Sequence, residues 1–269
     1  MVTGSVVTYH TPLEDIDNLI QSVEDSDIDT LFIIDNSKDD SLRNHVEGKS
    51  KIKYIKNINN GFGAGHNIAI KQSLALGAEY HAVINPDIYW RGPVIRVLRN
   101  YMNQHPECGL TIPKVTNPDG SNRYCCRMIP TPVDLIFRRF FPSSAWKQRK
   151  TEQHQLVYTG YSQIMEVPII SGCFMFMRCS ILKDIGGFDE RFFMYLEDID
   201  ISRRFAKVSK IIMNPEVSIV HLNEKGSYKN IRLLKTHLKS AIKYFNKWGW
   251  WFDKDRKIVN KRFIENNIQ

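Results

Sequence analysis

The first 105 residues alternate short β-branched runs with helical stretches, and this alternation constrains the fold more than any other feature. Strands are predicted at 2–9, 30–35, 52–56 and 80–85. Helical spacing of apolar residues predicts helices over 13–23, over 67–76 and from Pro93 to about residue 105. Strands that alternate with helices favour a mostly parallel sheet flanked by helices, which is an α/β architecture.

Polar side chains follow the predicted strands at the points where the strands end. Tyr9, Asp35 and the segment Asn85 to Asp87 occupy these positions. Open α/β sheets bind ligands at the carboxyl ends of their strands. The pattern therefore predicts a nucleotide-binding half over about residues 1–115.

A second informative stretch, 186–204, reads G-G-F-D-E-R-F-F-M-Y-L-E-D-I-D-I-S-R-R and sets carboxylates beside aromatic side chains. An ionised carboxylate is costly to bury unless it is paired, so such a cluster indicates a site whose chemistry uses the acids. If Glu197, Asp198 and Asp200 lie on the first turn of a helix, only one or two can face one side. Helix N-terminal electrostatics alone would also favour acids there. We expect Asp198 to be a general base.

Composition limits the class of protein. A chain of 269 residues is long enough for one domain with an appendage. No apolar run reaches the roughly 18 residues that span a bilayer, and no signal-peptide pattern opens the chain. Its five cysteines are odd in number and lack zinc-site spacing, which favours reduced thiols in a cytoplasm over a metal site.

The formal net charge of +8 is concentrated in the last 41 residues, where 11 residues are Lys or Arg and 3 are Asp or Glu. A predicted helix there carries an apolar stripe and a basic stripe, followed by Trp248, Trp250, Trp251 and Phe252. The apolar stripe is Ile231, Leu234, Leu238, Ile242 and Phe245, and the basic stripe is Lys235, Lys239, Lys243 and Lys247. This composition is typical of a segment that lies on an anionic membrane surface. Packing of the apolar stripe on the catalytic domain or on a second subunit of a homodimer is the alternative. No nucleic-acid recognition fold accompanies the charge, so we expect no nucleic-acid partner.

Seven blocks in chain order resemble those of inverting nucleotide-sugar glycosyltransferases of family two, especially the rhamnosyltransferase-like branch. The blocks are V-V-T-Y-H (6–10), I-I-D-N-S (33–37), N-N-G-F-G-A-G-H-N (59–67), I-N-P-D (84–87), S-G (171–172), the acidic stretch from residue 186 and V-H (220–221). The resemblance implies a GT-A-like single domain with a mixed, mostly parallel central sheet over residues 1–228. Donor binding would lie in about 1–115 and the acceptor side in about 116–228, with 229–269 as a basic amphipathic helical extension.

The resemblance also implies roles for individual residues. It makes Asp198 the catalytic base, and it places Glu197, Asp200, Ser171 and Gly172 on the acceptor side. Glu197 and Asp200 would support the acceptor or pair with Arg203 or Arg204. The implied donor-binding residues are Thr8, Tyr9, Asp35, Asn36, Asn60, Gly61, Asn67, Asn85 and Asp87. Glycines at 61, 63 and 65 precede a helix N-terminus expected near Asn67, which by itself indicates either a tight turn or an anion site.

Most nucleotide-sugar transferases of this fold carry D-x-D where this chain has Asn85-Pro86-Asp87. The resemblance implies that Asp87 and His221 hold a divalent cation, Mg²⁺ or Mn²⁺, with phosphate oxygens completing its shell. A structural turn at Asp87 and a structural histidine at 221 are the alternatives.

The implied reaction is a single displacement at the anomeric carbon of a nucleotide-diphosphate sugar, either dTDP-L-rhamnose or a UDP-hexose. The implied acceptor is a saccharide on a polyprenyl diphosphate lipid, in bacterial surface polysaccharide synthesis at the inner face of the cell membrane. A basic and aromatic loop or lid is expected over 127–163. The alternative of another class is a nucleotide-sugar or lipid-head-group binding protein without turnover.

Overall fold

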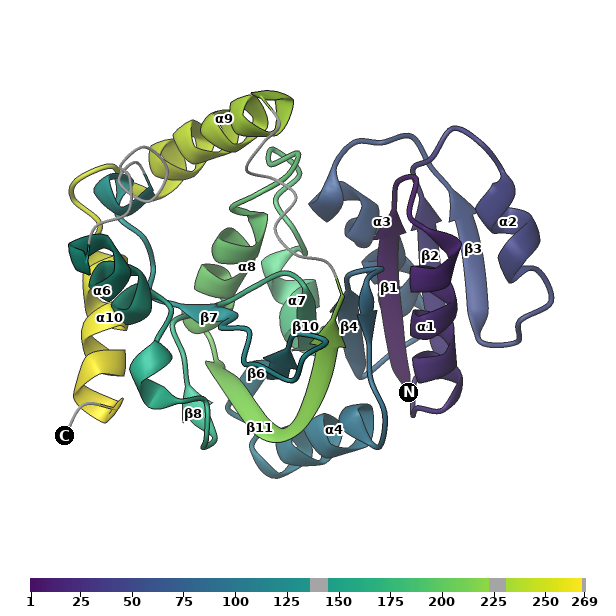
Figure 1. Ribbon diagram of the computed structural model, residues 1–269, viewed down its shortest axis with the longest axis horizontal. Helices are drawn as coiled ribbons and strands as arrows, with labels where there is room; N and C mark the ends of the chain where they lie inside the picture. The colour runs from purple at the N-terminus through teal and green to yellow at the C-terminus, as the bar shows by residue number, and fades with distance from the viewer. Residues whose placement is uncertain (136–144, 223–230, 268–269) are drawn as a thin grey trace.

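The computed structural model describes residues 1–135, 145–222 and 231–267. Within these ranges nine strands form one mixed sheet in the order β3-β2-β1-β4-β10-β6-β11-β5, with β8 paired to β11 (Figure 1). The strands are β1 (Val2–Thr8), β2 (Thr30–Asp35), β3 (Ile52–Lys56), β4 (Tyr80–Ile84), β5 (Ile88–Tyr89), β6 (Cys108–Thr116), β8 (Met165–Glu166), β10 (Phe174–Arg178) and β11 (Lys210–His221). A short pair, β7 (Cys126–Arg127) with β9 (Ile169–Ile170), lies beside the sheet.

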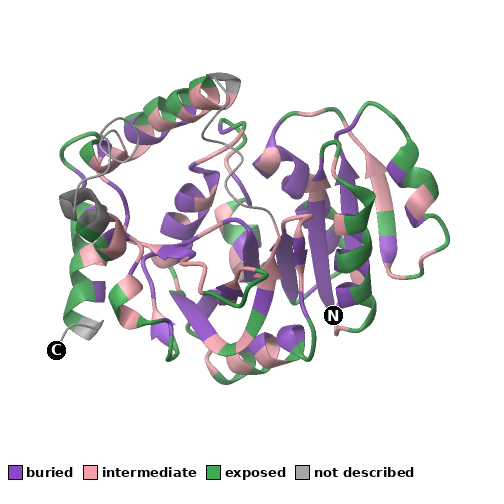
Figure 2. Cartoon of the chain, in the orientation of Figure 1, coloured by how far each residue is buried: buried purple, intermediate pink, exposed green. Residues whose placement is uncertain are grey.

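Helices flank this sheet, and Figure 2 shows that the strands are more buried than the helices around them. The helices are α1 (Leu13–Glu24), α2 (Ser41–Val46), α3 (Phe62–Ala75), α4 (Val94–Gln104), α6 (Ala145–His154), α7 (Cys179–Ile185), α8 (Glu197–Ala206), α9 (Ile231–Trp248) and α10 (Lys254–Asn267), with a 3₁₀ turn over Val157–Thr159. One main cluster of buried apolar side chains runs from β1 to β11 and joins both halves of the sheet. The chain from β1 to β11 therefore folds around a continuous core.

The first half of the sheet confirms the predicted parallel arrangement. β1 pairs in parallel with β2 and with β4, and β2 pairs in parallel with β3. Thr8 lies opposite Asp35 in the β1–β2 register, so the ends of these strands meet at one edge. The predicted helices over 13–23 and 93–105 match α1 and α4 closely.

The second half is mixed because β10 runs antiparallel to both of its neighbours, β4 and β6. β8, β9 and β10 flank Ser171 and Gly172, and Glu197, Asp198 and Asp200 do lie on the first turn of a helix, α8. The loop expected over 127–163 contains α6, and its R-R-F-F run lies outside the described residues.

The expected helix start near Asn67 is wrong, because α3 begins five residues earlier at Phe62. Gly61 precedes the helix at a φ of 108°, and the Phe62 N–H donates to the Phe193 carbonyl at 2.8 Å. A Cβ at position 61 would lie 2.2 Å from that carbonyl oxygen. Glycine is required here both by the backbone conformation and by the close approach of a second chain segment.

Part of the predicted apolar stripe of α9 packs on the catalytic domain beside α8, as in the alternative expectation for this stripe, and part of it stays exposed. Tyr244 and Phe245 are buried in a cluster with Phe192, Leu196 and Ile199. By contrast, Leu238 and Ile242 of the same predicted stripe are 42% and 51% exposed. Among the described residues, no helix is both long and apolar enough to cross a membrane. The predicted boundary at residue 228 lies outside the described residues.

Candidate active site

Asp35 is a carboxylate with several hydrogen-bond donors at the edge where β1, β2 and β4 end. It is fully buried and accepts hydrogen bonds from Thr8 Oγ1 at 3.0 Å and from the Tyr54 hydroxyl at 2.8 Å. The Ser37 N–H adds a bond of 3.0 Å, and Lys56 Nζ lies 3.4 Å away. Burial alone would raise the pKa of Asp35, but these bonds outweigh it and hold the pKa below its ordinary value.

The other predicted donor-side residues surround Asp35. Asn36 accepts a hydrogen bond from Asn57 Nδ2 at 2.8 Å, which links the end of β2 to the loop before α3. Tyr9 and Asn60 are exposed at the same edge, and the Tyr9 ring meets the His10 ring edge-on at 4.6 Å. The sequence did not single out Tyr54, Asn57 or Lys56, because they are ordinary strand and loop residues until β3 aligns beside β2.

Asp87 and His221 are brought together from opposite halves of the chain. β5 pairs with β11 so that His221 lies opposite Ile88, and the Leu222 N–H donates to the Asp87 carbonyl at 2.9 Å. The Asp87 Oδ2 and His221 Nε2 atoms are 3.1 Å apart. Burial alone would lower the pKa of His221, but the Asp87 carboxylate and the Cys173 thiol raise it to about 9.

The Asp87 and His221 side chains are separated as an ion pair, and the same separation fits two ligands of one divalent ion once His221 gives up its Nε2 proton to solvent. Two ligands at right angles on an octahedral ion, each about 2.1 Å from it, lie about 3 Å apart, which is close to the distance found. No set of three or more His, Cys, Asp or Glu side chains in the described part of the chain is arranged to hold an ion by itself. The remaining ligands would have to be water or oxygens of the substrate.

The three acids on the first turn of α8 lie in three different environments. Asp198 is half-buried, and it accepts hydrogen bonds from the Gly172 N–H at 3.2 Å and the Ile199 N–H at 2.9 Å. Glu197 is buried, and its Oε2 has no hydrogen-bond partner. Burial raises the pKa of Glu197 well above its ordinary value, and the Asp198 charge adds to this effect. Asp198 is the better placed of these two to reach an acceptor, because it is only half-buried and its carboxylate is held by two backbone N–H groups.

Asp200 has a structural role. It is fully buried and pairs with Arg204 Nε at 2.9 Å and with Lys247 Nζ at 2.6 Å. The Trp248 Nε1–H donates at 2.8 Å to Oδ1 of Asp200, the oxygen that also contacts Lys247. The predicted alternative for Asp200, pairing with Arg204, is present. Its contacts with Lys247 and Trp248 were not foreseen and fix the C-terminal extension to α8.

The loop before β10 connects the base to the Asn85-Pro86-Asp87 turn. Gly172 contacts Asp198, and the next residue, Cys173, accepts a hydrogen bond from the Asn85 N–H through its carbonyl at 2.8 Å. A Cβ at Gly172 would come within 3.2 Å of the Asp198 Cβ. This short loop therefore sets the position of the predicted base relative to the predicted metal ligands.

Asn67 joins the glycine-rich segment to the acidic segment rather than standing at a helix start. Its Nδ2 donates to the Phe188 carbonyl and to Glu190 Oε1, both at 2.9 Å, while its Oδ1 accepts from the Phe188 N–H at 2.8 Å. Together with the contact of Gly61 with Phe193, these bonds hold the two segments as one unit. Donor contact by Asn67 itself stays a prediction, because its amide group already has these partners.

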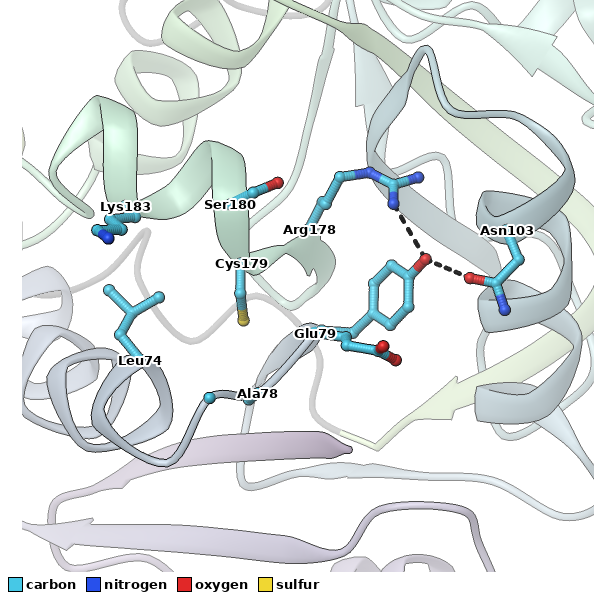
Figure 3. Close-up of a pocket in the computed structure, with 10 residues that line it drawn as sticks. Leu74, Ala78, Glu79, Asn103, Arg178, Cys179, Ser180 and Lys183 are labelled. Atoms are coloured by element: carbon cyan, nitrogen blue, oxygen red, sulfur yellow. Dashed lines mark hydrogen bonds between the residues drawn. The ribbon is translucent and has the colours of Figure 1, made fainter.

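A cavity of about 440 Å³ lies away from this site, at the opposite edge of the sheet (Figure 3). It is bordered by Tyr80, where β4 begins, and by Arg178, where β10 ends. The Tyr80 hydroxyl donates to Asn103 Oδ1 at 2.6 Å and accepts from Arg178 Nη1 at 3.2 Å. Since β4 runs from this cavity to the Asn85-Pro86-Asp87 turn, the cavity belongs to a different face of the protein.

Comparison with solved structures shows the GT-A glycosyltransferase fold. GalNAc-T7, solved with UDP, GalNAc and Mn²⁺, superposes with a TM-score of 0.65 at 12% sequence identity, over 98% of this chain and 56% of that chain. The 1–349 fragment of Staphylococcus aureus TarS, solved with UDP, superposes with a TM-score of 0.59 at 15% identity, over 98% of this chain and 70% of that chain.

Sequence comparison finds transferases of sugars. The N-acetylglucosaminyl-diphospho-decaprenol L-rhamnosyltransferase of Mycobacterium tuberculosis is 27% identical over 179 residues, which are 63% of this chain and 56% of the relative. The rhamnosyltransferase WbbL of Escherichia coli is 23% identical over 89% of this chain and 90% of that protein. The hexosyltransferase Agl10 of Haloferax volcanii is 29% identical over 74% of this chain and 59% of that protein. The chain thus aligns with a little over half the length of the mycobacterial relative.

The sequence profile described as Glycosyl transferase family 2 matches residues 5–186. The match spans β1 to α7 and so includes the donor-side edge, the Asn85-Pro86-Asp87 turn and the loop at Gly172. These residues make up more than half of the chain. This protein belongs to glycosyl transferase family 2.

Proposed function

We propose that this protein is an inverting glycosyltransferase that moves a sugar from a nucleotide-diphosphate donor to a saccharide acceptor. The observation that carries the proposal is the hydrogen bond from the Gly172 N–H to Asp198. The next residue, Cys173, accepts a hydrogen bond from the Asn85 N–H and so links the same loop to the Asn85-Pro86-Asp87 turn. A base and a diphosphate site in this relation suit a displacement at the carbon between them. One displacement inverts the configuration at that carbon, and no covalent intermediate on the protein is needed.

Asp198 has the capacity for the proton transfer. Each of its oxygens accepts one backbone N–H, and a carboxylate oxygen has two lone pairs, so both oxygens can still accept an acceptor hydroxyl. Removal of that proton by a positioned carboxylate contributes about 10² to 10⁴ to the rate. Burial and the Asp198 charge both raise the pKa of Glu197, which favours its neutral form.

Asp87 and His221 are the residues that would hold Mg²⁺ or Mn²⁺. When bound there, a divalent ion neutralises charge on the leaving diphosphate as a Lewis acid. On the donor side, the buried Asp35 carboxylate accepts hydrogen bonds from Thr8, Ser37 and Tyr54 and so fixes the ends of β1 and β2, where the exposed Tyr9 would meet the nucleoside.

The donor is dTDP-L-rhamnose and the acceptor is a saccharide on a polyprenyl diphosphate lipid, at the inner face of the cell membrane. Support comes from the two rhamnosyltransferase relatives, one of which is named for a diphospho-decaprenol acceptor. The free state of all five cysteines is consistent with a reducing compartment. A UDP-hexose is the second candidate donor, because the Haloferax relative is named a hexosyltransferase.

Turnover with defined substrates tests this proposal. The purified protein is mixed with Mn²⁺, a short polyprenyl diphosphate sugar and either dTDP-L-rhamnose or a UDP-hexose, and nucleoside diphosphate release is measured with and without acceptor. We expect acceptor-dependent release and a product whose anomeric configuration, read by NMR, is inverted. Donor binding without acceptor-dependent release would favour a binding protein, and retained configuration would contradict the single displacement.

A further inference from the structure

The C-terminal helix α9 has two faces with different partners. Its inner face carries Tyr244, which is fully buried, and Ser240, whose hydroxyl donates to the Met194 carbonyl at 2.7 Å. Its outer face carries Leu238 and Ile242 among exposed lysines. The outer face therefore remains at the protein surface although the helix is docked.

The outer face combines apolar and basic side chains without an acid. Lys235, Leu238, Lys239, Ile242 and Lys243 recur at steps of three and four and are all exposed. The sequence of α9 contains no Asp or Glu. Alternating Lys and aliphatic side chains suit an anionic lipid surface, where the charges meet head groups and the apolar groups enter the interface.

The turn after α9 extends this surface with aromatic residues. The Trp250 indole N–H donates to Asn246 Oδ1 at 2.8 Å, and Asn246 lies on the same outer face. Trp251 and Phe252 follow with exposed fractions of 65% and 93%. A nearly fully exposed Phe beside an exposed Trp is unfavourable in water and is typical of residues that insert between lipid head groups.

The position of α9 relates this surface to the candidate active site. The helix lies on the side of the molecule toward which β1 and β4 end (Figure 1). Ser240 on its inner face contacts Met194, three residues before Glu197, and the Tyr195 ring lies 5.3 Å from the His237 ring. Lys243, at the margin of the outer face, donates from its Nζ to the Arg191 carbonyl at 2.6 Å, so the outer face adjoins the acidic segment.

We infer that the outer face of α9, with Trp251 and Phe252, docks the protein on an anionic lipid bilayer and presents the acceptor side to sugars linked to lipid in that bilayer. The second part of this inference rests on the proposed function, whereas vesicle binding itself does not. The docking surface is defined as Lys235, Leu238, Lys239, Ile242, Lys243, Trp251 and Phe252. It differs from the predicted stripe, because Phe245 belongs to the packed face.

Vesicle flotation with two matched variants tests the docking surface. Lys239→Gln/Ile242→Ser removes one Lys and one half-exposed Ile from the outer face of α9, and Lys257→Gln/Ile258→Ser removes an equivalent pair from the exposed surface of α10. Vesicles contain phosphatidylcholine mixed with phosphatidylglycerol, or phosphatidylcholine alone. We expect wild type to float with the anionic vesicles, less so at high salt, and the α9 variant to partition about tenfold more weakly. The α10 variant should stay within about twofold of wild type.

A third variant and two activity assays separate this inference from the proposed function. Phe252→Ser removes an exposed side chain without disturbing the core, and it should weaken partition several-fold. In turnover assays, the α9 variant should match wild type with a water-soluble acceptor and lose activity only with an acceptor embedded in anionic vesicles. Absence of all turnover would count against the proposed function while leaving the vesicle result intact.

Four outcomes would overturn the docking surface. The first is that the wild type does not float at low salt, and the second is that the α9 variant floats as well as the wild type. The third is that the α10 variant loses as much vesicle binding as the α9 variant. The fourth is that light scattering finds a dimer in solution which Phe252→Ser dissociates. The last outcome would assign the surface to a second copy of the chain. Loss of binding to an RNA homopolymer in the same variants, with vesicle binding unchanged, would assign it to nucleic acid instead.

Discussion

The donor-side edge and the acceptor side hold their carboxylates in different ways. Asp35 is held mainly by uncharged donors from neighbouring strands and turns, namely Thr8, Ser37 and Tyr54. Asp200, on the acceptor side, is held by Arg204, Lys247 and Trp248, and the last two come from the C-terminal extension. The partners of Asp35 thus all lie in the segment from β1 to β4. The partners of Asp200 include residues almost 50 positions further along the chain.

The same contrast holds for the buried charges next to each site. Arg203 on α8 pairs with Asp253 at 2.7 Å, and both side chains are almost fully buried. Asp35 pairs instead with Lys56 at 3.4 Å, and among the described residues no buried charge pair like that of Arg203 supports it. Breaking charge pairs should therefore damage the acceptor side and leave the donor edge nearly intact.

The largest expected effect is at the base. Asp198→Asn should lower turnover by about 10² to 10⁴, because the amide cannot take the acceptor's proton. Nucleotide binding by calorimetry should be almost unchanged, since the donor edge is built without α8. Asp184→Asn, an exposed acid on α7, serves as the control. A variant that keeps more than half of the wild-type rate would remove Asp198 from this role.

The buried ion pair should give the next largest effect, measured as stability. Asp253→Ala leaves Arg203 buried without its partner, which should lower the free energy of unfolding by about 3–5 kcal/mol in urea titrations. Asp255→Ala is the matched control, because its ion pair with Lys207 is exposed and should contribute less than about 1 kcal/mol. Equal losses in the two variants would show that the extension does not depend on the buried pair.

A smaller effect is expected at the proposed metal ligands. Asp87→Ala should weaken binding of Mn²⁺ and of nucleoside diphosphate together by about tenfold or more, because one ion would be shared between the protein and the phosphates. Calorimetric titrations with and without Mn²⁺ measure the affinities for the ion and for the nucleoside diphosphate. Asp119→Ala, in an exposed turn, is the control. Undiminished metal-dependent nucleotide binding would place the ion elsewhere.

The smallest effect concerns acid sensitivity, which should differ between the two halves. His66 and His81 are fully buried in the donor half, and burial lowers the pKa of His81 to about 3 and that of His66 well below its ordinary value. Both therefore contribute stability above the unfolded-state pKa of about 6.5 that is lost as pH falls below it, by up to about 1.4 kcal/mol per pH unit for each group. Asp253, whose pKa is lowered by Arg203 against the opposing effect of burial, loses its contribution only below about pH 4.

Melting temperatures between pH 7 and pH 4.5 measure the loss of stability from the two histidines, and melting temperatures below pH 4 measure the loss from Asp253. His81→Gln should reduce the number of protons taken up on unfolding by about one in the range from pH 7 to pH 4.5, and so should make the free energy of unfolding less dependent on pH. This holds even if the variant is less stable overall. A slope that stays the same in His81→Gln would assign the acid sensitivity to other groups.

Much of the donor half could be predicted from the sequence because its signals are local. The runs that form β1 to β4 and the periodic helices α1 and α4 are contiguous segments, and a parallel arrangement follows from their alternation. The six-residue α2 was missed because it is too short to show a helical period, and the start of α3 was misplaced because glycines obscure it. The candidate base and metal ligands were found only because several short motifs occur together in order.

Contacts between distant segments could not be predicted. The bond from Phe62 to Phe193 and the bonds from Asn67 to Phe188 join residues more than 120 positions apart, and neither residue carries a signal of its partner. The same holds for the bonds from Tyr54 to Asp35 and from Trp248 to Asp200, which exist only after the strands and helices have packed. These contacts set the positions of the groups that the motifs identify.

The sequence by itself determined the α/β class, the edge where the strands end, the family and the basic character of the last 41 residues, because each depends on local pattern or composition. Only the tertiary structure decided which side of α9 is buried. The sequence grouped Phe245 with Leu238 and Ile242 on one stripe, since all three are apolar and lie at helical spacing. The structure buries Phe245 against α8 and exposes the other two, because Tyr244, Lys247 and Trp248 find charge and hydrogen-bond partners on α8 that fix the rotation of the helix.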